Sequence, residues 1–157
     1  MNEVRILPVE ERVLHGLWTR SNDKTIAKDI AALSAQYHAA VGLAAGRVLP
    51  YVVLSQNYDT ASGDFELFVG STTPSEGLET LVLSAGDYAV MTVKPKLGFL
   101  WGAAIGSAKR FFYTKWLPQS QYAAENIEYE YHTEKSVGKH PTIDLIFAIE
   151  KPILKTK

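Results

Sequence analysis

Two glutamates and a histidine, Glu128, Glu130 and His132, alternate with other residues in one short segment near the C-terminal end of the chain. Side chains of a β-strand point alternately to its two faces, so these three would share one face. Tyr129 and Tyr131 would share the opposite face, which we expect to pack under the second helix of the chain. The acidic face would then point either to water, as charged strand faces usually do, or into a cleft where a carboxylate meets a ligand.

No other pattern in the sequence indicates a catalytic or metal site. Gly138-Lys139 lacks the earlier glycine that a phosphate-binding loop needs, and neither G-x-G-x-x-G nor G-x-S-x-G occurs. The chain has no cysteine, which excludes disulfides, thiol nucleophiles and thiolate metal sites. The histidines have none of the spacings of helical zinc motifs; they are His15, His38, His132 and His140. We therefore expect neither a metal nor another cofactor.

The composition is that of an ordinary soluble domain. The 157 residues suffice for one sizeable core, and 46% of them are apolar and 21% charged. A formal net charge of -1 argues against nucleic acid as a direct partner, because phosphate binding needs a basic excess or a basic face. The densest basic stretch, Lys109-Arg110 to Lys115, is typical of the solvent side of a helix.

The chain is expected to be cytoplasmic and to have no membrane partner. Its first residues lack the basic and apolar regions of a secretion signal. The longest uncharged stretch, residues 30–46, is too short and too polar to cross a membrane.

The periodicity of apolar residues predicts two helices. The first follows the N-cap side chains of residues 21–23, begins at Lys24 and ends near Gly42. The second spans about Phe99–Trp116 and is stopped by Pro118. The two apolar stripes match at an offset of 75 residues and consist of Ile26, Ile30, Leu33, Tyr37 and Val41, then Trp101, Ile105, Ala108, Phe112 and Trp116.

Two strands are predicted before and after each helix, so the chain has the pattern β-β-α-β-β twice. The repeats span about residues 3–72 and 77–152, with a short linker between them. We expect a single α+β domain, residues 1–157, whose antiparallel sheet encloses a ligand cleft between the halves. The expected strands are residues 4–7, 13–19, 49–58, 65–69, 78–83, 88–93, 127–133 and 143–149.

Four segments form an ordered set of motifs that spans most of the chain. Trp116–Tyr122 has the form W-L-P-x-S-x-Y after a helix, and Tyr129–Lys135 looks like a following strand of the form F-E-x-Y. Ser84–Val90 looks like P-A-G-x-Y-A-V, and Phe65–Gly70 looks like a strand that ends in V-G. Together they resemble the GyrI-like, or AraC-type, effector-binding domains of bacterial transcription activators. The resemblance implies a duplicated, SHS2-like fold around a central pocket, here as a stand-alone member without a DNA-binding module.

The resemblance further implies binding of amphipathic, often cationic, aromatic compounds. The glutamate of F-E-x-Y corresponds to Glu130, and Glu128 on the same strand face is the alternative pocket carboxylate. Glu66 is assigned to another strand, because Val69-Gly70 follows it. A cationic ligand would supply the counter-charge that a buried carboxylate needs, and aromatic walls would add cation–π contacts of ~0.5–2 kcal/mol each. The candidate walls, for each of which core packing is the competing interpretation, are Trp18, Tyr88, Trp101 and Phe147.

Two other functions agree with the same resemblance. Some stand-alone relatives are thought to hydrolyse cyclopropane-bearing, DNA-alkylating toxins. In such an enzyme Glu130 would act as the general base or position water, and Tyr88 would donate to the substrate carbonyl. A role as a protein inhibitor, implied by the gyrase-inhibiting namesake, has no acidic run or exposed amphipathic helix to support it. The sequence does not separate the binding protein from the hydrolase.

Overall fold

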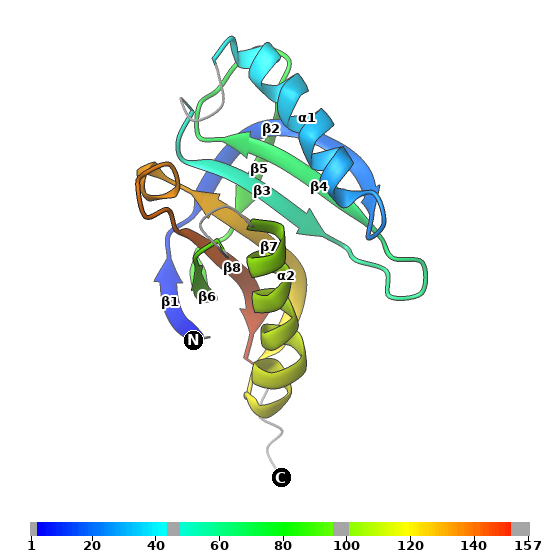
Figure 1. Cartoon of the computed structure of the whole chain (residues 1–157), viewed down its shortest axis with the longest axis vertical. Helices are drawn as coiled ribbons and strands as arrows, with labels where there is room; N and C mark the ends of the chain where they lie inside the picture. The colour runs from blue at the N-terminus through cyan, green and yellow to red at the C-terminus, as the bar shows by residue number, and fades with distance from the viewer. Residues whose placement is uncertain (1–2, 44–47, 96–100, 152–157) are drawn as a thin grey trace.

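The computed structural model describes residues 3–43, 48–95 and 101–151 as an α+β domain of eight strands and two α-helices (Figure 1). The helices are α1 (Ile26–Val41) and α2 (Trp101–Phe111), and α2 continues as a π-helical turn (Phe112–Trp116) and a 3-10 turn (Leu117–Gln119). A second 3-10 turn spans Glu134–Ser136. The strands are β1 (Arg5–Val9), β2 (Arg12–Asn22), β3 (Tyr51–Gln56), β4 (Asp64–Ser71), β5 (Glu79–Leu83), β6 (Gly86–Val93), β7 (Ala123–His132) and β8 (Ile143–Glu150).

The predicted strands and helices are present in the predicted order, and the predicted α+β class is confirmed. Gly42 ends α1 in the left-handed conformation (φ 72°), as its sequence position indicated. The predicted start of the second helix at Phe99 lies outside the described residues.

The predicted N-cap of the first helix is wrong. Ser21 and Asn22 are the last residues of β2, and Thr25 precedes α1 without a capping hydrogen bond. Both Thr25 and Ser21 instead donate their hydroxyls to the carboxylate of Asp29 in the first helical turn, at 2.7 and 2.8 Å. These two hydrogen bonds lower the pKa of Asp29. The start of α1 is therefore tied to the end of β2 through one carboxylate.

All eight strands form one antiparallel sheet in the order β1-β6-β8-β7-β3-β4-β2-β5. The order is symmetric between the two repeats, in which β1 to β4 correspond to β5 to β8. When each strand is replaced by its counterpart, the same order is obtained, read from the other edge of the sheet. The first strand of each repeat pairs with the other repeat: β1 with β6, and β5 with β2. The two-fold relation lies between the central strands β3 and β7, which pair directly.

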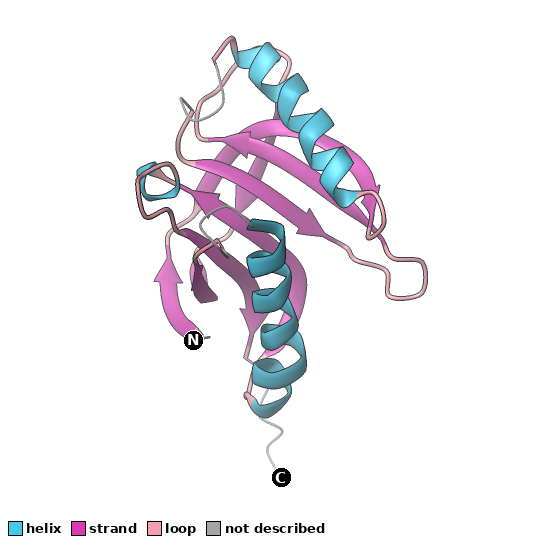
Figure 2. Ribbon diagram, viewed as in Figure 1, coloured by secondary structure: helices cyan, strands magenta, loops and turns pink. Residues whose placement is uncertain are grey.

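Both helices lie on the same face of the curved sheet (Figure 2). The predicted apolar stripe of α1 packs on β3 and β4, and that of α2 packs on β6 and β8. Each stripe therefore performs the covering role that its spacing predicted. Among the described residues, no helix is both long enough and apolar enough to cross a membrane.

The opposite face of the sheet curls in on itself and forms a third apolar cluster that includes Leu14, Phe68 and Tyr129. The predicted packing of the tyrosine face of β7 under the second helix is therefore wrong. Tyr131 lies on that face too, with the guanidinium of Arg12 4.0 Å from its ring centroid. The acidic face of β7 is the one that points toward the helices.

The curl depends on a glycine pair in β2 and β4. Gly16 is directly opposite Gly70, and a Cβ on Gly16 would lie 1.9 Å from the carbonyl oxygen of Val69. The strands approach so closely that no larger residue fits. At this point β2 pairs with both β4 and β5, and the sheet bends over the ring of Phe68.

Candidate functional site

A pocket of about 650 Å³ opens on the helix-bearing face, between the start of α1 and the end of α2 with the π-helical turn that follows it. Its floor is formed by β3 and β7, the two strands beside the two-fold relation. The strand register places Glu128 of β7 opposite Ser55 of β3, and both side chains line the pocket. The lining residues are Asp23, Ile26, Ser55, Tyr58, Thr60, Phe65, Lys109, Arg110, Tyr113, Ala124, Asn126 and Glu128.

Glu128 is held by one side chain of α2 and one of the π-helical turn that continues it. The phenol of Tyr113 donates to Oε1 at 2.7 Å, and Nζ of Lys109 lies 2.7 Å from Oε2. Lys109 and Tyr113 are four residues apart and therefore project from the same side of the helix. Only 17% of the Glu128 side chain and 27% of the Lys109 side chain are exposed, so this is a largely buried ion pair.

The surroundings of this pair keep its members in defined protonation states. Desolvation works against the charge on Lys109, but the attraction of Glu128 and Glu130 outweighs it and raises the pKa of Lys109. Burial, and then the neighbouring Glu128 carboxylate, raises the pKa of Tyr113 far above its ordinary value. At neutral pH Lys109 is thus a cation and Tyr113 a neutral donor. The predicted placement of the Lys109 stretch on the solvent side of a helix is wrong for Lys109 itself.

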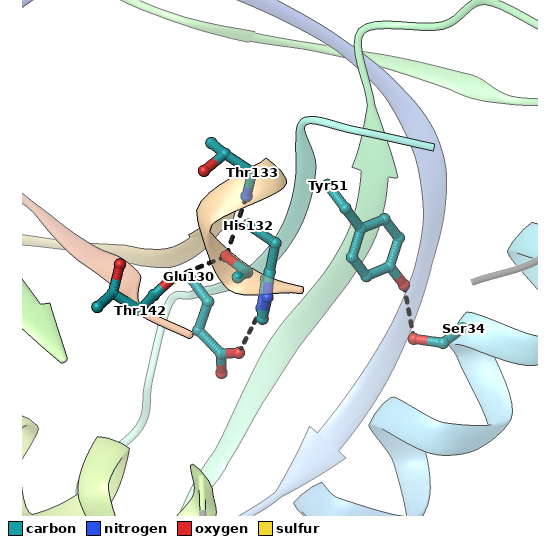
Figure 3. A network of polar contacts seen from close by, with 7 residues as sticks. Ser34, Tyr51, Glu130, His132, Thr133 and Thr142 are labelled. Carbon is teal, nitrogen blue, oxygen red and sulfur yellow. Dashed lines mark hydrogen bonds and ion pairs between the residues drawn. The ribbon is translucent and has the colours of Figure 1, made fainter. Parts of the chain in front are cut away.

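Glu130, two residues along β7, points to the same face but has a different set of neighbours (Figure 3). Its Oε1 lies 3.1 Å from Nε2 of His132, and only 15% of its side chain is exposed. The ring of Tyr51 is 6.1 Å from that of His132, and its hydroxyl shares a 2.6 Å hydrogen bond with Ser34 of α1. Burial raises the pKa of Tyr51 to about 12, with Glu130 contributing to the same effect.

The turn after β7 fixes the end of this network. The backbone N–H of Thr133 donates to the hydroxyl of Ser136 at 3.0 Å, and that hydroxyl donates to the carbonyl of Thr142 at 2.8 Å (Figure 3). His132, the last residue of β7, thus stands directly before a hydrogen-bonded turn, and its ring contacts Glu130.

A second acidic group stands at the rim of the pocket. Asp23 accepts a 2.5 Å hydrogen bond from the phenol of Tyr58. Arg110 lies on the same rim with an exposed side chain. Within the described ranges, no group of three His, Asp or Glu side chains is arranged to hold a metal ion. The pocket therefore presents the carboxylate of Glu128 on a mostly apolar floor, and this carboxylate is already paired with the ammonium of Lys109.

The structure brings Glu128 and Glu130 to one face but places the four candidate wall residues elsewhere. Trp18 and Tyr88 belong to the apolar cluster on the opposite face, where the hydroxyl of Tyr88 donates to the carbonyl of Ser84 at 2.6 Å. Tyr88 and Glu130 are therefore on opposite faces of the sheet. Glu66 is separate as well, and it lines a smaller depression together with Trp18.

The other two candidate walls belong to the apolar cluster between α2 and the sheet. Phe147 is 1% exposed, and its ring stacks on that of Phe112 with centroids 3.9 Å apart. Trp101 packs against the same cluster from the first turn of the helix. The aromatic residues that do line the pocket are Tyr58, Phe65 and Tyr113.

Sequence reasoning missed these three pocket aromatics. For Tyr113 a signal was available, because its spacing from Lys109 places both on one side of the helix. Tyr58 and Phe65 flank the β3–β4 turn, and their direction depends on how that turn folds over the sheet.

No protein-family model matches the chain, and no curated protein matches it. Its structure is nevertheless similar to solved structures of very different sequence. An integron cassette protein from Vibrio cholerae is 14% identical with a TM-score of 0.65, and the match covers 94% of this chain and 95% of that chain. A putative bacterial transcription regulation protein from Staphylococcus aureus MU50 is 10% identical with a TM-score of 0.67, over 94% and 98% of the two chains.

A third similar structure is that of SAV2435 bound to tetraphenylphosphonium, which is 9% identical with a TM-score of 0.67 and is matched over 94% of each chain. These similarities cover nearly the whole of this chain. They show that it shares the fold of these structures, the GyrI-like fold that its ordered motifs indicated.

Proposed function

We propose that this protein belongs to the GyrI-like effector-binding family and binds small amphipathic cations with aromatic groups in the pocket between α1 and α2. The observation that supports this most is a carboxylate on the floor of an apolar and aromatic pocket of about 650 Å³. That volume is within the usual range for small-ligand sites. A similar structure, SAV2435, was solved with a ligand of this chemistry.

Glu128 is our proposed pocket carboxylate, with Glu130 as a second negative charge nearby. Glu128 lines the pocket directly, whereas Glu130 is directed toward His132. Ile26, Phe65 and Tyr113 offer apolar and aromatic surface to a flat or propeller-shaped ligand. Several polar groups of the lining are already paired within the protein, Tyr58 with Asp23 and Tyr113 with Glu128, which favours recognition by charge and shape over recognition of one precise structure.

Calorimetric titration with tetraphenylphosphonium tests this proposal. Glu128→Gln should weaken binding about 10-fold or more, equivalent to about 1.4 kcal/mol, while Glu130→Gln should have a smaller effect. Glu66→Gln is the matched control, because it makes the same change on the same sheet outside the pocket. Equal affinity in wild type, Glu128→Gln and Glu130→Gln, or no binding by any of them, would contradict the proposal.

The hydrolase alternative has no observation in its favour. Its expected donor, Tyr88, is hydrogen-bonded to Ser84 on the face of the sheet that does not carry Glu130. We therefore propose binding, and not turnover, as the function of the pocket.

A further inference from the structure

The negative charge that a cationic ligand would use is already neutralised inside the protein. Nζ of Lys109 lies 2.7 Å from Oε2 of Glu128, and both side chains are more than two-thirds buried. An incoming cation and the Lys109 ammonium would therefore compete for one carboxylate oxygen. The outcome of that competition determines which cations bind.

Lys109 does not leave this position by losing its proton at neutral pH. Its positive charge is favoured by three carboxylates, Glu128, Glu130 and Asp23, which outweigh the cost of its desolvation. Leaving must instead be a movement of the side chain. The lysine stem has four flexible carbons, and 27% of the side chain already reaches solvent.

The carboxylate is fixed independently of Lys109. Oε1 of Glu128 accepts the phenol hydrogen bond of Tyr113, so one oxygen stays oriented while the other changes partner. The pocket therefore has the parts of an exchange site, with a fixed anion, a movable internal cation and apolar walls.

Building on the proposed function, we infer that Lys109 is an exchangeable internal counter-ion that selects the cations this pocket accepts. A compact, strongly hydrated cation such as a primary ammonium offers Glu128 nothing that Lys109 does not already supply. A large aromatic cation also removes the apolar surface of Ile26 and Phe65 from water, and this burial drives the exchange. The ligand class is accordingly that of delocalised, weakly hydrated aromatic cations, and simple amines and polyamines are excluded.

Arg110 provides a matched control within the same pocket. It is the next residue along α2 and lines the same rim, but its side chain is exposed. Within the described part of the chain it has no carboxylate within ion-pair distance. Removing its charge changes the net charge of the pocket as much as removing that of Lys109, without freeing Glu128.

The test measures tetraphenylphosphonium affinity by calorimetry in wild type, Lys109→Met and Arg110→Met. Lys109→Met should bind about 10-fold more tightly or better, while Arg110→Met, which removes a positive charge from the rim without freeing Glu128, should show a smaller gain of about 3-fold at most. Tetraphenylborate, an anion of the same shape, should lose affinity in Lys109→Met. Spermidine in large excess should not displace tetraphenylphosphonium from the wild type.

Two further variants keep the test decisive if Lys109→Met folds poorly. Lys109→Gln retains a hydrogen-bond donor for Glu128 without the charge and should also bind the cation more tightly. Lys109→Arg retains the charge and should resemble wild type. Unchanged cation affinity in Lys109→Met and Lys109→Gln, or an equal gain in Arg110→Met, would overturn the inference while leaving the proposed function intact. Absence of binding in wild type and all variants would instead refute the proposed function.

Discussion

The stability contributed by the Lys109–Glu128 pair can be measured separately from any ligand by a double-mutant cycle. The four proteins are wild type, Lys109→Met, Glu128→Gln and the double variant. Lys109→Met leaves a largely buried carboxylate with only the Tyr113 hydrogen bond, whereas Glu128→Gln leaves an ammonium that can extend into solvent. The first single variant should therefore cost more than the second.

The structure places the size of the coupling between two known limits. Exposed ion pairs couple by about 0.2–1 kcal/mol, and breaking a fully buried pair costs about 3–5 kcal/mol. With 27% and 17% of the two side chains exposed, the pair is nearer the buried limit but retains access to water. We expect about 2–3 kcal/mol for Lys109→Met, about 1–2 for Glu128→Gln and a coupling energy of about 1–2 kcal/mol.

Urea unfolding monitored by tryptophan fluorescence gives the four free energies of unfolding. The same slope with urea is required in all four proteins, since a changed slope would mean a changed unfolded or native state. A coupling energy below about 0.3 kcal/mol, which is within the usual error of additivity, would show that the pair is effectively solvated. That result would also remove the physical basis for treating Lys109 as the internal counter-ion of Glu128.

Three further predictions concern the sheet and its polar network. Gly16→Ala should lower the free energy of unfolding by more than about 3 kcal/mol in chemical denaturation, because the added methyl collides with the carbonyl of Val69; a loss below 1 kcal/mol would contradict this packing. Phe147→Ala should cost about 3–5 kcal/mol by the same measurement, because the ring stacked on Phe112 would leave a cavity, and a cost below 1.5 kcal/mol would argue against that stack. The pKa of Tyr51 is raised to about 12 in the folded protein. The protonated phenol therefore stabilises the fold fully below pH 10, and this stabilisation is lost as the pH rises toward 12. Tyr51→Phe should therefore lose about 1–2 kcal/mol less stability than wild type between pH 10 and 12, and identical pH profiles would be the contrary result.

Much of the fold could be predicted from the sequence because each element depends on local periodicity. The stripe that includes Leu33 and Tyr37 is buried as predicted, and Gly42 ends its helix. The wrong predictions concern which elements pack against each other, because a local sequence pattern does not specify the packing partner of a strand or helix. Alternation in β7 separated Glu130 from Tyr129 correctly, but could not tell which face the helices would cover. Both faces of this sheet are buried, so burial of the aromatic face did not identify it as the helix-bearing one.

The candidate site was only partly predictable for the same reason. The sequence grouped Glu128 and Glu130, since they are neighbours on one strand and need no tertiary information to be grouped. It put Glu130 first as the pocket carboxylate, whereas Glu128 is the one that lines the pocket. The pocket walls and the partner of Glu128 come from α2 and the β3–β4 turn, which are distant in sequence. Lys109 looked like an ordinary solvated lysine because its buried partner is 19 positions away along the chain. Only the strand order brings that partner beneath the helix.

The first strand of each repeat, β1 or β5, pairs with a strand of the other repeat. For this reason neither half is a self-sufficient folding unit. A chain cleaved within residues 72–77 would give one fragment with β1 to β4 and another with β5 to β8, each missing the strand that borders its own β2 or β6. Each fragment would carry a donor strand with no acceptor and an acceptor edge with no donor. The domain is in this sense a covalently joined, intertwined dimer. Its two fragments should complement one another when mixed, and the pocket should form only in their complex, because its floor joins one strand from each.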